Sequence, residues 1–79
     1  MNTEQFVALF AEQFDETPAQ SFSIDTEFRS LDEWSSLTAL GIIAMIDEEF
    51  DVTIKGDDIR NASTIGDLYR VVQSRLGNK

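Results

Sequence analysis

The chain has 79 residues, of which fifteen are acidic and six are basic, so its formal net charge at pH 7 is −9. This length suits one domain, residues 1–79, and the negative charge repels nucleic acids and anionic membranes while it favours basic protein partners. The chain contains neither Cys nor His, which excludes disulfides, the usual zinc sites and His-based catalytic triads.

A first amphipathic helix is expected over residues 3–15. Its apolar residues recur at helical spacing and are expected to face the core: Phe6, Val7, Phe10 and Phe14. Asn2 with Gln5 three residues later resembles a capping box at the start. Pro18 disfavours helical geometry at the residue before it, so the helix is expected to end upstream of it.

Residues 19–34 show no sustained period and are interpreted as a long loop with a few apolar anchors. Such a loop can carry the chain back to the start of a second helix that lies near antiparallel to the first. We interpret Trp34, at the end of the loop, as packing the loop onto that helix, with contact to a partner as the alternative.

The second helix, residues 36–50, has two apolar faces. A stripe roughly 100° wide is expected to face the core and consists of Ala39, Ile42, Ile43, Ile46 and Phe50. A second arc, roughly 60° wide, lies on another side of the helix between two acids and consists of Leu37, Leu40 and Ala44, bordered by Asp47 and Glu48. A small domain has little core for a second face, so we expect this arc to bind a partner.

A short helix over residues 57–61, capped by Asp57, and a last helix over residues 64–76 complete the chain. Thr64 and Asp67 resemble a capping box for the last helix. The predicted fold is therefore an all-α four-helix bundle with three main helices and one short one.

Several motifs at matching spacing resemble the acyl carrier protein family over roughly residues 3–76. In that family a serine in an Asp-Ser-Leu motif at the start of the second helix receives 4′-phosphopantetheine, and the resemblance places it at Ser36. The matching motifs are Ser36-Leu37, Ile46-Asp47-Glu48-Glu49-Phe50, Asp25-Thr26-Glu27-Phe28, Val52-Thr53-Ile54 and Ser63-Thr64-Ile65-Gly66-Asp67-Leu68.

Two positions depart from the family pattern. Ser35 stands where Asp usually precedes the modified serine, and Gly41 stands where an acid is common. Neither change removes the Ser36 hydroxyl, and the Ser35 side chain can cap the helix as Asp would.

The resemblance implies a carrier that holds acyl groups as thioesters on the 4′-phosphopantetheine attached to Ser36 and that is not itself an enzyme. Its expected partners are a phosphopantetheinyl transferase and acyl-loading, elongating or transferring enzymes. By resemblance, Leu37, Leu40, Ala44, Asp47 and Glu48 form the docking face for basic patches on these enzymes. Trp34 could then contact the arm as well.

Two alternatives stay open. The chain could carry aminoacyl or peptidyl groups, or it could be an unmodified carrier-like interaction module, which Ser35 in place of Asp favours. Because the sequence has no long apolar run, leader or lipidation motif, we expect no membrane insertion and a cytoplasmic location. Since the sequence starts at Met1 and ends soon after the last predicted helix, we expect a free-standing carrier, and we also expect a monomer. Trp34 and Ser35 differ from a general fatty-acid carrier, so we expect a dedicated lipid, polysaccharide-modifying or secondary-metabolite pathway.

Overall fold

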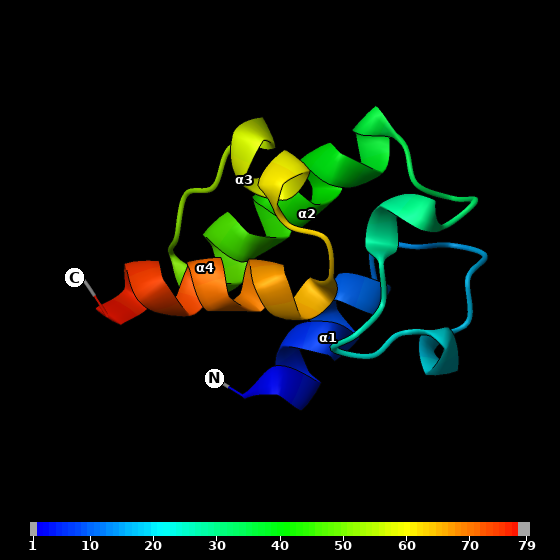
Figure 1. Cartoon of the computed structure of the whole chain (residues 1–79), viewed down its shortest axis with the longest axis horizontal. Helices are drawn as coiled ribbons and strands as arrows, with labels where there is room; N and C mark the ends of the chain where they lie inside the picture. The colour runs from blue at the N-terminus through cyan, green and yellow to red at the C-terminus, as the bar shows by residue number, and fades with distance from the viewer. Residues whose placement is uncertain (1, 78–79) are drawn as a thin grey trace.

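A computed structural model describes residues 2–77. Within this range the chain forms four α-helices and no strand, which confirms the predicted all-α fold (Figure 1). The helices are α1 (Thr3–Ala11), α2 (Ser36–Phe50), α3 (Gly56–Asn61) and α4 (Ile65–Gly77). Two single 3₁₀ turns, η1 (Ala19–Ser21) and η2 (Phe28–Ser30), lie in the long loop. No helix formed by residues 2–77 combines the length and apolar character needed to span a membrane.

The helices surround one apolar core. In Figure 1, α1 runs towards the end of the molecule that holds the long loop, and α2 runs back from it. α4 contacts each of the other three helices. The large side chains that are fully buried come from α1, η2, α2 and α4: Phe6, Phe10, Phe28, Ile42, Ile46, Ile65, Leu68 and Val72. Each such burial contributes about 1.5–3 kcal/mol of stabilisation, so these contacts hold the bundle together.

α1 ends four residues earlier than its apolar period predicted. The helix stops at Ala11, and Phe14 is nevertheless buried, because the N–H groups of Gln13 and Phe14 turn to carbonyls three residues back, as in a 3₁₀ turn. The Glu33 carboxylate then accepts hydrogen bonds from the backbone N–H groups of the next three residues, 15–17, at 2.7–3.0 Å. A carboxylate distant in sequence therefore replaces the helix as the acceptor for these groups.

The core face of α2 is wider than predicted on one side. Ile42 and Ile46 are fully buried as expected, but Met45 is also buried, and it lies outside the predicted stripe. Gly41 precedes Met45 by one turn and so shares its side of the helix. A Cβ added at Gly41 would lie 3.3 Å from the side-chain oxygen of Gln13. The segment just after α1 therefore approaches α2 on this side, which a helix period alone does not reveal.

The long loop is fixed to the start of α4. The N–H of Ile65 donates to the carbonyl of Thr26 at 3.1 Å, and the N–H of Gly66 donates to the carbonyl of Ile24 at 2.8 Å. A Cβ added at Gly66 would lie 3.0 Å from that same carbonyl oxygen and 2.9 Å from the Ile24 side chain. Only glycine allows the loop to pack this closely against the helix.

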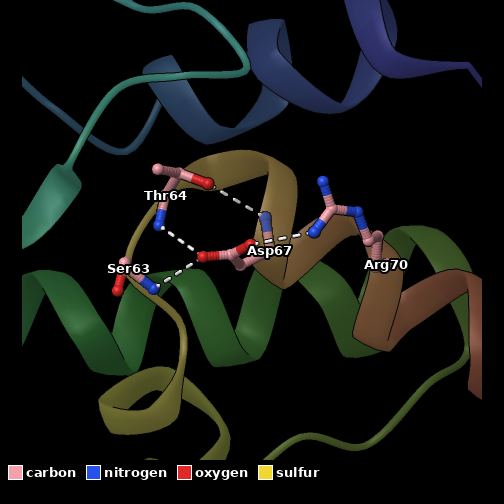
Figure 2. Close-up of polar contacts among 4 residues, drawn as sticks. All are labelled: Ser63, Thr64, Asp67 and Arg70. Carbon is pink, nitrogen blue, oxygen red and sulfur yellow. Dashed lines mark hydrogen bonds and ion pairs between the residues drawn. The ribbon is translucent and has the colours of Figure 1, made fainter.

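The predicted capping box of α4 is present (Figure 2). The Asp67 carboxylate accepts from the backbone N–H groups of Ser63 and Thr64, and the Thr64 hydroxyl accepts from the N–H of Asp67 at 3.1 Å. Arg70 pairs with the second oxygen of the same carboxylate at 3.0 Å. The Asp67 carboxylate and the Thr64 hydroxyl thus satisfy backbone N–H groups at the helix start that would otherwise be left unpaired.

The prediction that Asp57 caps α3 was wrong. α3 begins at Gly56, and the Asp58 carboxylate, rather than Asp57, accepts the N–H of Lys55 at 2.9 Å. Arg75 on α4 donates two hydrogen bonds of 2.8 Å to the same carboxylate. Asp58 faces α4 while Asp57 faces solvent, and this tertiary contact decides which of the two neighbouring acids is used.

Candidate functional site at the start of α2

The first turn of α2 is capped by Ser35. Its backbone is extended, and its hydroxyl oxygen accepts the N–H of Thr38 at 3.3 Å, which confirms the predicted capping role. The Thr38 hydroxyl in turn donates to the carbonyl of Glu33 at 3.1 Å. These bonds hold the end of the loop against the first turn of the helix.

Ser36 is the first residue of α2, and its side chain is exposed. Among the described residues, its hydroxyl has no hydrogen-bond partner, whereas the neighbouring Ser35 hydroxyl is engaged in the cap. A hydroxyl in this position is accessible from outside and leaves room for a bulky group attached to it. The helix start also favours an anion, because backbone N–H groups and the positive end of the helix dipole lie there.

The second apolar arc of α2 lies on the surface. Leu37 is 79% exposed and Leu40 is 62% exposed, and in residues 2–77 these are the two large hydrophobic side chains that stand out from the surface. Ala44, Asp47 and Glu48 are also exposed. The structure therefore gathers the predicted partner-binding residues on one helix face, beside Ser36 and away from the core.

A surface depression of about 400 Å³ opens on the other side of Ser36. It is formed where the loop, α2 and α3 meet, and it is lined by Arg29, Trp34, Ser35, Ser36, Ala39, Gly56, Ile59 and Arg60. We call this depression the Ser36 pocket.

Trp34 has a packing role, as predicted, but its ring contacts are with η2 and the segment after α1 rather than with α2, the helix that was predicted as its partner. Its ring centroid lies 4.9 Å from that of Phe28 and 6.4 Å from that of Phe14, so it joins the loop to the core. The residue is half-buried, and it also lines the Ser36 pocket. The pocket wall is therefore fixed by core packing.

The pocket residues that were not assigned to the site from the sequence include Arg29, Gly56, Ile59 and Arg60. Arg29 could have been noticed, because it is the only base between residues 25 and 51. Ile59 and Arg60 come from α3, more than twenty positions after Ser36, and no local motif joins them to it. Their proximity is a product of helix packing.

The carboxyl groups with shifted pKa values lie in structural contacts. The Thr17 hydroxyl, and then backbone N–H groups, lower the pKa of Glu33. Hydrogen bonds from Arg75 lower the pKa of Asp58, and those from the backbone of Ser63 and Thr64 lower the pKa of Asp67. Within residues 2–77, no three acidic side chains gather in a position to hold a metal ion.

Comparison with known families matches this chain to the model described as a phosphopantetheine attachment site. The match covers residues 4–72, which includes Ser36, α2, α3 and most of α1 and α4. Searches of curated proteins and of solved structures gave no match. The family match thus spans most of the bundle.

Proposed function

Because the chain belongs to the family of phosphopantetheine attachment domains, we propose that it is an acyl carrier protein whose Ser36 bears the group. Domains of this family hold 4′-phosphopantetheine covalently on a serine. The observation that carries the assignment is the exposed Ser36 hydroxyl at the first position of α2, which has no hydrogen-bond partner within residues 2–77. The adjacent Ser35 hydroxyl is occupied as the helix cap.

The chain's own residues would hold and present the group. When bound, 4′-phosphopantetheine supplies a terminal thiol that carries an acyl group as a thioester. The chain has no thiol of its own, because it contains no cysteine. Ser36 fixes the point of attachment, and the core packing of α2 holds that point at the surface. The chemistry on the cargo is assigned to separate enzymes.

The attachment site is tested by incubating the purified chain with coenzyme A and a broad-specificity phosphopantetheinyl transferase and measuring its intact mass. The wild type and Ser35→Ala are expected to gain one phosphopantetheine, and Ser36→Ala is expected to gain none. Circular dichroism checks that Ser36→Ala is folded, as expected for an exposed side chain. Modification of Ser36→Ala would move the site to another serine, and an unmodified wild type with several transferases would favour the interaction module.

The exposed face of α2 is proposed to dock the partner enzymes, which include the transferase. Leu37, Leu40 and Ala44 supply apolar contact area, and Asp47 and Glu48 attract basic patches. Electrostatic attraction of this kind mainly raises the rate of encounter and depends on salt. Such transient binding suits a carrier that must visit several enzymes in turn.

Docking is tested with the double variant Asp47→Lys/Glu48→Lys. We expect kcat/KM of a partner enzyme to fall about tenfold or more, while the free energy of unfolding changes by only about 0.5 kcal/mol. Glu12→Lys/Glu16→Lys is the matched control, because these two acids are also exposed and the change in net charge is the same. Equal turnover of both variants would remove Asp47 and Glu48 from the interface.

The cargo is proposed to be acyl rather than aminoacyl, on the resemblance of the α2 motifs to acyl carriers. It can be identified by accurate mass on the chain purified from its native cells, before and after hydroxylamine cleaves the thioester. A released group that contains an amine would replace acyl by aminoacyl or peptidyl cargo. The cytoplasmic location, the monomeric state and the dedicated pathway stay predictions.

A further inference from the structure

The Ser36 pocket contains two of the six basic residues of a strongly acidic chain. Arg29 comes from η2 and Arg60 from α3, so the two cations reach the pocket from separate segments that meet beside the first residue of α2. Arg29 is also the only base between residues 25 and 51, a stretch with eight acids. Positive charge is therefore concentrated at one point of a negative molecule.

The arginines of the chain differ in what they contact. Arg75 makes two hydrogen bonds to Asp58, and Arg70 pairs with Asp67. Arg60 pairs with Asp57 three residues earlier, but both side chains are more than 70% exposed, so this contact contributes little to stability. Arg29 forms no ion pair within residues 2–77. The two pocket arginines are thus the ones least committed to the fold.

The position of both arginines is set by packing beneath them. Phe28, next to Arg29, is fully buried and its ring contacts that of Trp34. Ile59, next to Arg60, is 3% exposed. The backbone on each side of the pocket is therefore anchored in the core, while the guanidinium groups remain in solvent.

We propose that Arg29 and Arg60 form an anion-binding subsite for the phosphodiester attached to Ser36. This inference rests on the proposed attachment at Ser36. Guanidinium groups donate charge-assisted hydrogen bonds to phosphate oxygens, with a planar geometry that suits two acceptor oxygens at once. Arg60 can leave Asp57 at little cost, because that pair is exposed.

The phosphodiester is a better ligand for this subsite than a carboxylate on the cargo. It is joined directly to a side chain that lines the pocket, so its effective concentration there is high. The cargo lies at the far end of a flexible arm and meets the pocket less often. The role of both arginines is to position the start of the arm, and neither is catalytic.

The subsite is tested on fully modified protein by ³¹P NMR and by thermal unfolding. Four chains are compared: the wild type, Arg29→Gln, Arg60→Gln and the double variant. The wild type is expected to be more stable with the group attached than without it. That gain should shrink in each single variant and disappear in the double variant, and the ³¹P resonance of the double variant should shift from that of the wild type. High salt should reduce this difference in ³¹P resonance between the double variant and the wild type.

Arg70→Gln is the charge-matched control, because it removes one exposed guanidinium from α4 and lies outside the pocket. It is expected to leave the ³¹P resonance unchanged. An unchanged resonance and an unchanged stability gain in the double variant would overturn the subsite. Because both side chains are exposed, the variants are expected to fold, and circular dichroism checks this.

Two further outcomes separate this inference from its alternatives. In the first, the stability gain and the ³¹P resonance of the variants differ from those of the wild type only when the thiol carries a carboxylate-ended acyl group. If the free thiol and a neutral acyl group show no such difference, the pocket binds cargo and the proposal is wrong. If intact mass shows no modification at Ser36, the proposed function fails and the subsite falls with it. If Ser36 is modified but neither arginine substitution changes the stability gain or the ³¹P resonance, the subsite is wrong while the proposed function stands.

Discussion

The two longest helices that begin after the loop, α2 and α4, start in opposite ways. At α4, the carbonyls of Ile24 and Thr26 and the Asp67 carboxylate all accept backbone N–H groups of the first turn or of the residues before it. At α2, the Ser35 hydroxyl accepts one N–H, and Ser36 beside it is exposed. One helix start is covered by the rest of the chain, and the other faces outward.

The difference suggests that the start of α4 serves the stability of the fold and that the start of α2 serves the proposed function. The start of α4 joins the loop, the last helix and the core, so changes there should be felt by the whole fold. The start of α2 needs only enough order to hold Ser36 at the surface, and its remaining N–H groups stay available. Substitutions at the two ends should therefore have unequal effects on stability, and three predictions test this.

The largest effect is expected from Gly66→Ala. The new Cβ would meet the backbone oxygen and side chain of Ile24 at 2.9–3.0 Å, so the loop must move and its hydrogen bond to α4 is weakened. We expect a loss of about 2 kcal/mol in the free energy of unfolding, measured by urea denaturation.

Gly56→Ala is the control for this substitution. A Cβ at Gly56 would lie 3.6 Å from the Arg60 guanidinium, an ordinary contact with a flexible side chain. The stability of this variant is expected to stay within about 0.5 kcal/mol of the wild type. Equal stabilities for the Gly66 and Gly56 variants would show that the loop is not fixed to α4 as described.

A smaller, pH-dependent effect is expected from Asp67→Asn. The pKa of Asp67 is lowered in the folded chain, chiefly by hydrogen bonds from the backbone of Ser63 and Thr64. Its carboxylate therefore stabilises the fold at pH values above its ordinary pKa of 3.8, and this contribution is lost as the pH falls through the lower folded value.

Thermal unfolding between neutral and acidic pH checks this effect. The melting temperature of the wild type should fall as the pH decreases below about 5, and that of Asp67→Asn should start lower and fall less. Glu33 and Asp58 also have lowered pKa values, so some acid sensitivity should remain in the variant. Parallel curves for the two proteins would exclude Asp67 as a source of the pH dependence.

Features encoded in neighbouring residues could be predicted from the sequence. The helix period located α2 to its observed bounds, and capping residues one turn apart identified Ser35 and the pair Thr64 and Asp67. The exposed arc that includes Leu37 and Leu40 followed from the same period. In each case the residues that interact are within one or two turns, where helix geometry fixes their relation.

Features that depend on distant segments could not be predicted. The early end of α1 is accompanied by hydrogen bonds to Glu33, and Met45 is buried on the side of α2 where the segment just after α1 approaches Gly41. Two neighbouring acids, Asp57 and Asp58, look alike in the sequence, and only the position of α4 distinguishes them. The Ser36 pocket has the same origin, because helix packing brings its two arginines together.

The smallest effect is expected at Ser35, where the family usually has Asp. Ser35→Ala removes the cap and should cost about 1 kcal/mol or less, since water can reach the exposed N–H groups. Ser35→Asp keeps a capping oxygen and adds a negative charge at the helix start, so the unmodified chain should gain about 0.5 kcal/mol or less. After modification of Ser36 the added charge lies beside a phosphodiester, and like-charge repulsion should cancel this gain. Urea denaturation of both variants, with and without the group, measures the difference, and a gain of the same size in both states would show that the phosphodiester does not repel the added carboxylate.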